Sequence, residues 1–249
     1  MISAFLKRRW WLTQNRILTT ISSALIIPII LYTTIVSVLN NVIVHSIDEI
    51  PYEHWAFPGL IMIIATIGLF PLLYRDFFDL RIHRHILQPI TLAPVTKIEI
   101  VFGIVITAII ESLSFVIIGM AVLIILMPNP LVWYQYLIIL IYVVLYNGVI
   151  ANVFVTIGLV TDRVTMYMFA VLTFLMFILF GSGILVEFEF YPSSLGSIFA
   201  NLPTSVLMHG LRSLLFFQRI DWFSLIYPLL IAVAWFGVNG LLFKYKSKQ

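Results

Sequence analysis

The sequence predicts an all-α, polytopic membrane protein with six transmembrane helices. Hydrophobic residues make up 62% of the 249 positions and charged residues 10%, whereas a soluble globular chain has about half and about a quarter. The apolar residues form six long segments, and each has the roughly 17 or more residues that a helix needs to cross about 30 Å of hydrocarbon. The basic residues collect between alternate segments, which is the charge bias of a multi-pass protein.

The six predicted spans divide the chain without any sign of a second domain. They are Ile17–Leu39, Phe57–Tyr74, Ile100–Met127, Leu131–Val160, Val164–Val186 and Trp222–Phe243. The third and fourth are long enough to tilt or to protrude from the bilayer. Basic residues precede the first span as in a secretory signal, but Ile17–Leu39 is too long for such a signal and lacks a small-residue cleavage site. We therefore expect a single transmembrane domain over residues 1–249.

The segment before the first span, residues 2–14, mixes basic and aromatic side chains at roughly helical spacing. These side chains are Phe5, Leu6, Lys7, Arg8, Arg9, Trp10, Trp11 and Leu12. The pattern predicts an amphipathic helix that lies in the membrane interface. The alternative is a basic anchor beside a belt of aromatic residues.

The distribution of charge predicts which side of the membrane each connection faces. Twelve of the fourteen basic residues lie in the N-terminal segment, after the second and fourth spans, or after the sixth span. The other two, Arg212 and Arg219, share the opposite side with six of the eleven acidic residues. Because basic residues are retained on the cytoplasmic side, we expect both termini to be cytoplasmic.

The connection after the second span, residues 75–97, is polar and basic although it lies between two apolar segments. Pro89 and Pro94 prevent one continuous helix through it, because proline lacks an amide donor and clashes with the preceding turn. Thr96 and Glu99 have the spacing of a capping box, which predicts that the next helix begins there. Such a compact charged element is a candidate docking surface, and the alternative is an ordinary solvated loop on the positive side.

The segment before the last span, residues 187–221, is too apolar for a solvated loop and too interrupted to cross the membrane. Pro203 divides it, so we expect two short helices that re-enter the outer leaflet, with other helices shielding their broken backbone. Arg212 is expected to anchor these helices through main-chain carbonyl groups or a lipid phosphate. Glu187 and Glu189 form either a solvated rim or a guide for a departing substrate.

Several kinds of chemistry are excluded by residues that the chain lacks. It has no cysteine, which removes disulfides, thiolate metal sites and cysteine nucleophiles. It has no GxxxxGK[ST] phosphate-binding loop and no HExxH zinc motif. His83 and His85 could bind a metal, but no further ligand lies near them in the sequence. We expect no catalytic residue, metal or cofactor in this chain.

Glu111 is the one acidic residue deep inside a predicted span, about 17 Å along the third helix from Ile100. An ionisable group inside a membrane is costly and is a candidate functional residue. Three roles are open, namely a structural pair across a helix interface, a contact with substrate in the transport path, and a proton relay. Phe174 and Phe177 of the fifth span could line the same path, or they could be ordinary packing residues.

Three short motifs flank the second, third and last spans. They are Phe-Pro-Gly-Leu-Ile-Met at 57–62, Leu-Ala-Pro-Val-Thr at 92–96 with Gly103 beyond it, and Asn-Leu-Pro-Thr at 201–204 followed by Gly-Leu-Arg at 210–212. In order, spacing and topology the chain resembles the ABC-2 family of ATP-binding-cassette exporter permeases over essentially its whole length. Two features depart from the family pattern. Asp79–Arg84 is basic where the family has a glutamate-rich lead-in, and Pro203 is shifted by one position from the asparagine.

The resemblance implies a homodimer whose first cytoplasmic loop docks on a separate ATPase subunit, which would bind ATP and magnesium. It also implies the interfacial helix and the re-entrant outer helices. The residues it assigns to ATPase coupling are Asp76, Asp79, Arg81, Arg84, Pro89, Pro94 and Lys97. Those it assigns to the outer helices are Asn201, Pro203 and Arg212.

From these observations we expect the permease subunit of an exporter in a bacterial inner membrane, which moves an amphipathic drug, lipid or lipid-linked glycan outward. A dedicated exporter of polysaccharide or O-antigen-type glycan is the alternative within transporters. A six-span scaffold or immunity protein is the alternative outside them. A secondary carrier would need inverted repeats and several buried charges, which the sequence does not display.

Overall fold

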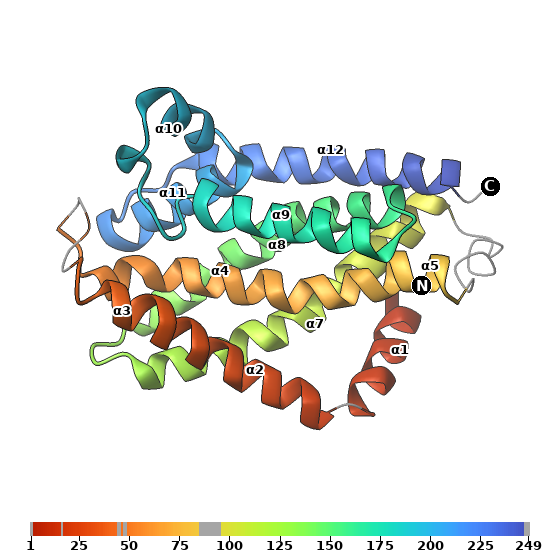
Figure 1. The fold of residues 1–249 in the computed structure, drawn as a ribbon, viewed down its shortest axis with the longest axis horizontal. Coiled ribbons are helices and arrows are strands. Elements are labelled where there is room, and N and C mark those ends of the chain that lie inside the picture. The colour runs from red at the N-terminus through yellow and green to blue at the C-terminus, as the bar shows by residue number, and fades with distance from the viewer. Residues whose placement is uncertain (1, 16, 44–45, 47–48, 85–95, 247–249) are drawn as a thin grey trace.

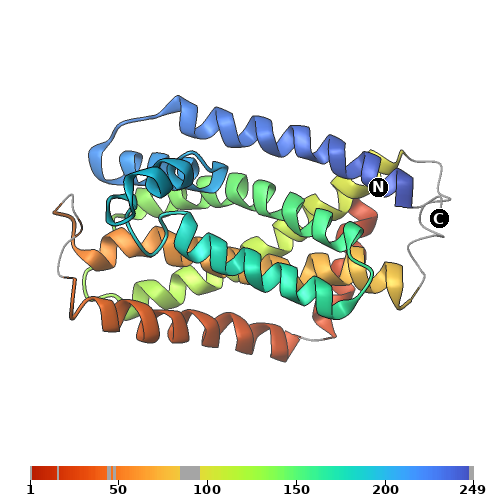
Figure 2. The same cartoon turned by 45° about the horizontal axis from the view of Figure 1, so that its top comes forward.

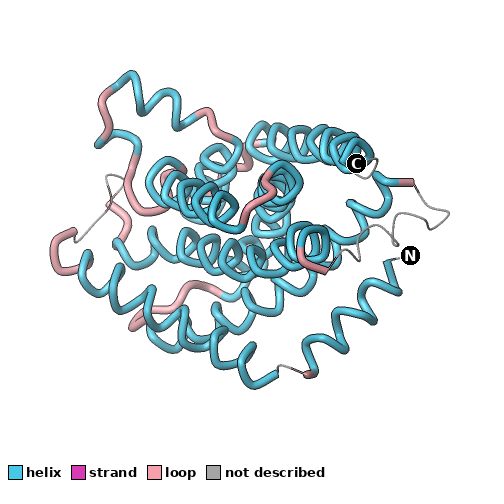
Figure 3. Tube along the Cα trace, turned by 45° about the vertical axis from the view of Figure 1, so that its right-hand side comes forward, coloured by secondary structure: helices cyan, strands magenta, loops and turns pink. Residues whose placement is uncertain are grey.

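The structure, a computed structural model, is a bundle of long helices and describes residues 2–15, 17–43, 46, 49–84 and 96–246. Six helical stretches are long and apolar enough to cross a membrane, as the sequence predicted. No strand occurs in the described part of the chain, which is drawn almost entirely as helix and loop in Figure 3. The chain is therefore an all-α protein of the multi-pass membrane class.

The first half of the bundle contains three spans and the helix that precedes them. Its elements are α1 (Ile2–Gln14), α2 (Ile17–Leu31), the π-helix η1 (Tyr32–Val36), α3 (Ser37–Leu39), α4 (Tyr52–Leu73), the π-helix η2 (Tyr74–Asp79), α5 (Leu80–Ile82) and α7 (Lys97–Leu126). The α2–η1–α3 stretch, the α4–η2–α5 stretch and α7 are spans one to three.

The second half contains three further spans and two shorter helices. Its elements are α8 (Trp133–Val160), α9 (Val164–Gly181), the 3-10 turn η3 (Phe188–Phe190), α10 (Ser193–Ala200), α11 (Pro203–Phe217) and α12 (Trp222–Lys246). Span five ends at Gly181 rather than at the predicted Val186, because the chain turns at Gly183, whose φ of +67° is a left-handed conformation.

The bundle has two ends, at which the connections between its helices gather (Figure 1). The start of α1, α5, the α8–α9 connection and the end of α12 lie together, and we call this the basic end. The opposite end, which we call the far end, holds α3, α10 and α11. Contacts between Arg81, Asp162 and Lys246 join three of the connections at the basic end. The grouping of connections predicted from charge is thus present.

α4 is the central helix, and it is buried by α7, α8 and α11 (Figure 2). Most of its side chains from Tyr52 to Leu73 are inaccessible. In contrast, α2, α9 and α12 expose many large apolar side chains on the outside of the bundle, which suits helices surrounded by lipid. Buried amides join neighbouring helices, since Asn239 donates to the main-chain and side-chain oxygens of Asn152 at 3.0 and 2.9 Å.

Span two is longer than the sequence indicated. We expected it to end at Tyr74 and the polar connection to begin at residue 75, but the helix continues through η2 and α5 to Ile82. The π-helical turn of η2 follows Pro71, which has no amide hydrogen to donate. In span one, η1 likewise follows Pro28. In both spans the helix therefore continues past the proline through a wider turn.

The two predicted non-spanning regions are helical. α1 lies at the basic end and runs across the direction of the spans (Figure 1). α10 and α11 are two separate helices, and Pro203 occupies the first turn of α11 as predicted. α11 packs against α4, α8 and α12, so neighbouring helices shield it. The capping box of Thr96 and Glu99 is also confirmed, because each accepts a hydrogen bond from the main-chain nitrogen of the other at 3.3 and 3.1 Å.

Candidate functional site

A cluster of charged residues joins α1, η2 and α7 at the basic end. Its centre is Arg9, which is 4% exposed although the sequence suggested an interfacial position. The guanidinium group donates to Asp76 of η2 and, at 2.7 Å, to Glu111 of α7. It also donates to Thr107 Oγ1 at 2.9 Å. One side chain therefore fastens α1 to the two helices that flank the connection between spans two and three.

Asp76 is shared by three guanidinium groups. Besides Arg9, Arg75 donates to it at 3.2 Å and Arg8 lies 3.6 Å from it. Its side chain is 1% exposed, and the surrounding positive charge offsets the cost of burying its negative charge. The π-helical turn contributes to this arrangement, since Arg75, Asp76 and Asp79 all belong to or adjoin the widened segment. Pi-helical turns are frequent at functional sites.

Glu111 belongs to the same cluster. Its carboxylate accepts from Arg9 and, at 2.9 Å, from Thr13 of α1. The neighbouring Ser112 instead turns to the core, where it donates to the main-chain oxygen of Ala65 at 3.3 Å. The pairing partner considered from the sequence was a nearby serine or threonine of the span, whereas the partner in the structure is a cation of α1. Glu111 is 18% exposed and also lines a cavity at the basic end.

The other predicted coupling residues lie outside this cluster. Arg84 is 62% exposed and pairs with Asp79 at 2.9 Å. Arg81 points inward, where it donates to the main-chain oxygen of Thr161 and pairs with Asp162 at 3.0 Å. Lys97 begins α7. Pro89 and Pro94 lie outside the described residues.

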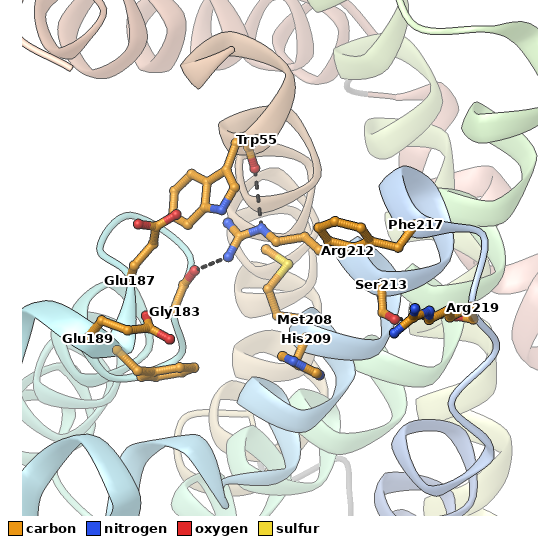
Figure 4. Close-up of a pocket in the computed structure, with 11 residues that line it drawn as sticks. Trp55, Gly183, Glu187, Glu189, Met208, His209, Arg212, Ser213, Phe217 and Arg219 are labelled. Atoms are coloured by element: carbon orange, nitrogen blue, oxygen red, sulfur yellow. Dashed lines mark hydrogen bonds between the residues drawn. The ribbon is translucent and has the colours of Figure 1, made fainter. Parts of the chain in front are cut away.

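The far end contains a second partly buried arginine, Arg212 of α11 (Figure 4). It donates to the main-chain oxygen of Gly183 at 2.6 Å and to those of Trp55 and Ile184 at 3.3 Å. Its guanidinium carbon is 3.5 Å from the centre of the Trp55 ring. The predicted hydrogen bonds to carbonyl groups are thus confirmed, and they bind α11 to the turn after α9 and to the start of α4.

Arg212 lines a cavity of about 390 Å³ that also contains Glu187, Glu189, His209 and Arg219. Acidic and basic side chains face one another across it (Figure 4). The two glutamates are therefore part of a mixed-charge cavity at the far end, rather than a purely acidic rim.

The remaining predicted residues do not converge on one site. Asn201 ends α10, where its amide donates to Ser197 and its main-chain oxygen accepts from Tyr227. Phe174 packs against Phe154 inside the bundle, with 5.9 Å between ring centres. Phe177 is 42% exposed and touches Phe199 of α10. Glu111 lies at the opposite end, so the structure does not bring it together with Phe177 in one cavity.

Arg9 is the site residue that sequence reasoning missed. It was counted with Lys7 and Arg8 as part of a basic segment, and nothing in its immediate neighbours distinguishes it. A signal was nevertheless present, because an acidic residue inside a span requires a positive partner. Comparisons of the chain with family models, with curated proteins and with solved structures found no match.

Proposed function

We propose that the chain is the membrane-spanning permease subunit of an ABC exporter, which moves an amphipathic substrate outward and is driven by a separate ATPase subunit. The observation that carries this proposal is the Arg9 cluster. It ties α1 to η2 and α7, which are the two elements on either side of the charged connection between spans two and three. A force applied to that connection would reach three helices at once.

The proposed mechanism follows from this geometry. Closure of the ATPase subunits around ATP and magnesium displaces the connection at the basic end. α4 and α7 pack against each other, so they move together, and Arg9 carries α1 with them. Two copies of the chain form the transport path between them, and both termini face the cytoplasm of a bacterial inner membrane. The chain itself performs no covalent chemistry.

Two features of the sequence support the need for a partner. The chain has no phosphate-binding loop, so if ATP drives transport, another polypeptide binds it. The three motifs that resemble ABC-2 permeases occur in the same order as in that family. Arg84 is the most suitable described contact for the partner, because its side chain is largely exposed, whereas Arg81 is engaged inside the chain.

The test is purification of the tagged chain from its native membrane in mild detergent, followed by measurement of ATP hydrolysis and export. We expect a nucleotide-binding subunit to copurify, and Arg84→Glu to separate its ATP hydrolysis from export. Arg163→Glu is the matched control, because Arg163 is exposed in another connection at the basic end. Hydrolysis of ATP by the isolated chain, or normal coupling in Arg84→Glu, would contradict the proposal.

A further inference from the structure

A cavity of about 610 Å³ lies at the basic end beside the Arg9 cluster. It is lined by α1, η2 and α7, which the cluster joins, and also by α2, α4 and α5. Part of the lining, which we call the charged wall, consists of Arg8, Arg75, Arg84, Asp79 and Glu111. Another part, which we call the less polar wall, includes Leu12, Thr20, Ser23, Leu72 and Phe115.

The charged wall and the adjoining Arg9 cluster together have more positive than negative side chains. The four arginines at positions 8, 9, 75 and 84 pair with three described carboxylates, Asp76, Asp79 and Glu111. Asp76 alone is shared by three of the arginines. In addition, the Nη2 atom of Arg75 is buried and has no hydrogen-bond partner among the described residues. That atom is enclosed, but the side chains of Arg75 and Arg8 are 28% and 35% exposed, so other atoms of these two guanidinium groups can donate to one more anion in the cavity.

We propose that this cavity binds the phosphate group of an anionic membrane lipid. Guanidinium groups bind phosphate oxygens through charge-assisted hydrogen bonds, and a phosphodiester carries the single negative charge that balances the wall. The less polar wall suits the glycerol and the first methylene groups of the lipid. α1 contributes Arg8 and Leu12 to the cavity, and its Trp10 and Trp11 are exposed, as is typical of side chains at a membrane interface. The adjacent leaflet is therefore the source of the ligand.

This site does not depend on an ATPase partner. It would make the contacts that hold α1 depend on bound lipid, because the lipid phosphate would share Arg75 and Arg8 with Asp76.

The experiment is native mass spectrometry of the purified chain titrated with phosphatidylglycerol or phosphatidylcholine. Both lipids carry the phosphodiester, but the quaternary ammonium of phosphatidylcholine cancels its charge and would lie close to the arginines. We therefore expect phosphatidylglycerol to bind about tenfold more tightly. Arg75→Gln should remove this preference, whereas Arg163→Gln should retain it. Equal binding of the two lipids by the unaltered chain would overturn the proposal.

Two further experiments distinguish a lipid phosphate from free phosphate and keep the test valid if Arg75→Gln does not fold. Inorganic phosphate at the same concentration should not displace the lipid, and displacement would show that the cavity recognises the free anion instead. Thr20→Leu narrows the less polar wall without removing any charge, so it should weaken phosphatidylglycerol binding even if Arg75→Gln does not fold. If every correctly folded variant of the two, Arg75→Gln and Thr20→Leu, still preferred phosphatidylglycerol as the unaltered chain does, the proposed site would be refuted.

Discussion

Two arginines, the buried Arg9 at the basic end and the partly buried Arg212 at the far end, are held in different ways. Arg9 is held by the carboxylates of Asp76 and Glu111. Arg212 donates to three main-chain carbonyl groups, and its flat face lies on Trp55. Ionic partners respond to any change of charge nearby, whereas carbonyl partners belong to the backbone and fix its path.

From this difference we infer that the basic end is the more mobile part of the molecule and the far end the more rigid part. At the basic end, several arginines compete for a few carboxylates, so a small displacement can exchange one pair for another. At the far end, Arg212 and the close packing of α11 against α12 fix the turn at Gly183. We therefore expect a motion driven from the basic end to be resisted at the far end.

The largest effect should come from Arg9→Gln. It leaves Asp76 buried with weaker partners, and breaking a buried ion pair on one side costs about 3–5 kcal/mol. Thermal or denaturant unfolding in detergent measures the loss. Lys7→Gln is the control, because Lys7 is exposed and contacts the ring of Trp11. A loss no larger than that of Lys7→Gln would show that the cluster does not hold α1.

Arg212→Met should have the next largest effect, about 2–3 kcal/mol, because it removes the donors to three carbonyl groups while keeping an apolar stem. Arg212→Lys should restore little of the loss, since one ammonium group does not reproduce the planar fork of donors. The same unfolding measurement applies. Full restoration by lysine would mean that charge, and not the carbonyl geometry, matters at the far end.

Gly210→Ala tests the rigidity of the far end by packing alone. A Cβ atom at Gly210 would overlap Oγ and Cβ of Ser224 in α12, so we expect a loss of about 1–3 kcal/mol. Gly237→Ala is the matched control, because nothing lies within 4 Å of a Cβ atom there. The control should be neutral or slightly stabilising. Equal unfolding temperatures for the two variants would argue against close α11–α12 packing.

The smallest effect on stability should come from Arg84→Gln. An exposed ion pair such as Arg84–Asp79 contributes less than about 1 kcal/mol. If the basic end is the driven part, this variant should unfold like the unaltered chain and still lose export, which a transport assay in vesicles would measure. Loss of stability as large as that of Arg9→Gln would place Arg84 in the structural cluster instead.

The sequence predicted the elements that depend on composition and local rules, and it did less well where tertiary contacts decide. The six spans follow from long apolar runs, the start of α7 from Thr96 and Glu99, and the division of α10 from α11 from Pro203. The extension of span two to Ile82 was not predicted. The residues after Tyr74 are polar, which favours a loop when only the sequence is considered, and the partners that stabilise them lie on other helices. For the same reason Asp76 was placed in the coupling segment but its burial against Arg9 was not foreseen.

The central claim is that the basic end faces the cytoplasm, where another subunit's ATP chemistry can act on it. The chain has no cysteine, so a single introduced cysteine can be labelled without background. His83→Cys lies at the exposed end of span two, and Ser194→Cys is exposed on α10. In intact cells, a membrane-impermeant maleimide should label residue 194 and leave residue 83 unlabelled until the membrane is opened. Labelling of residue 83 from outside would contradict the account.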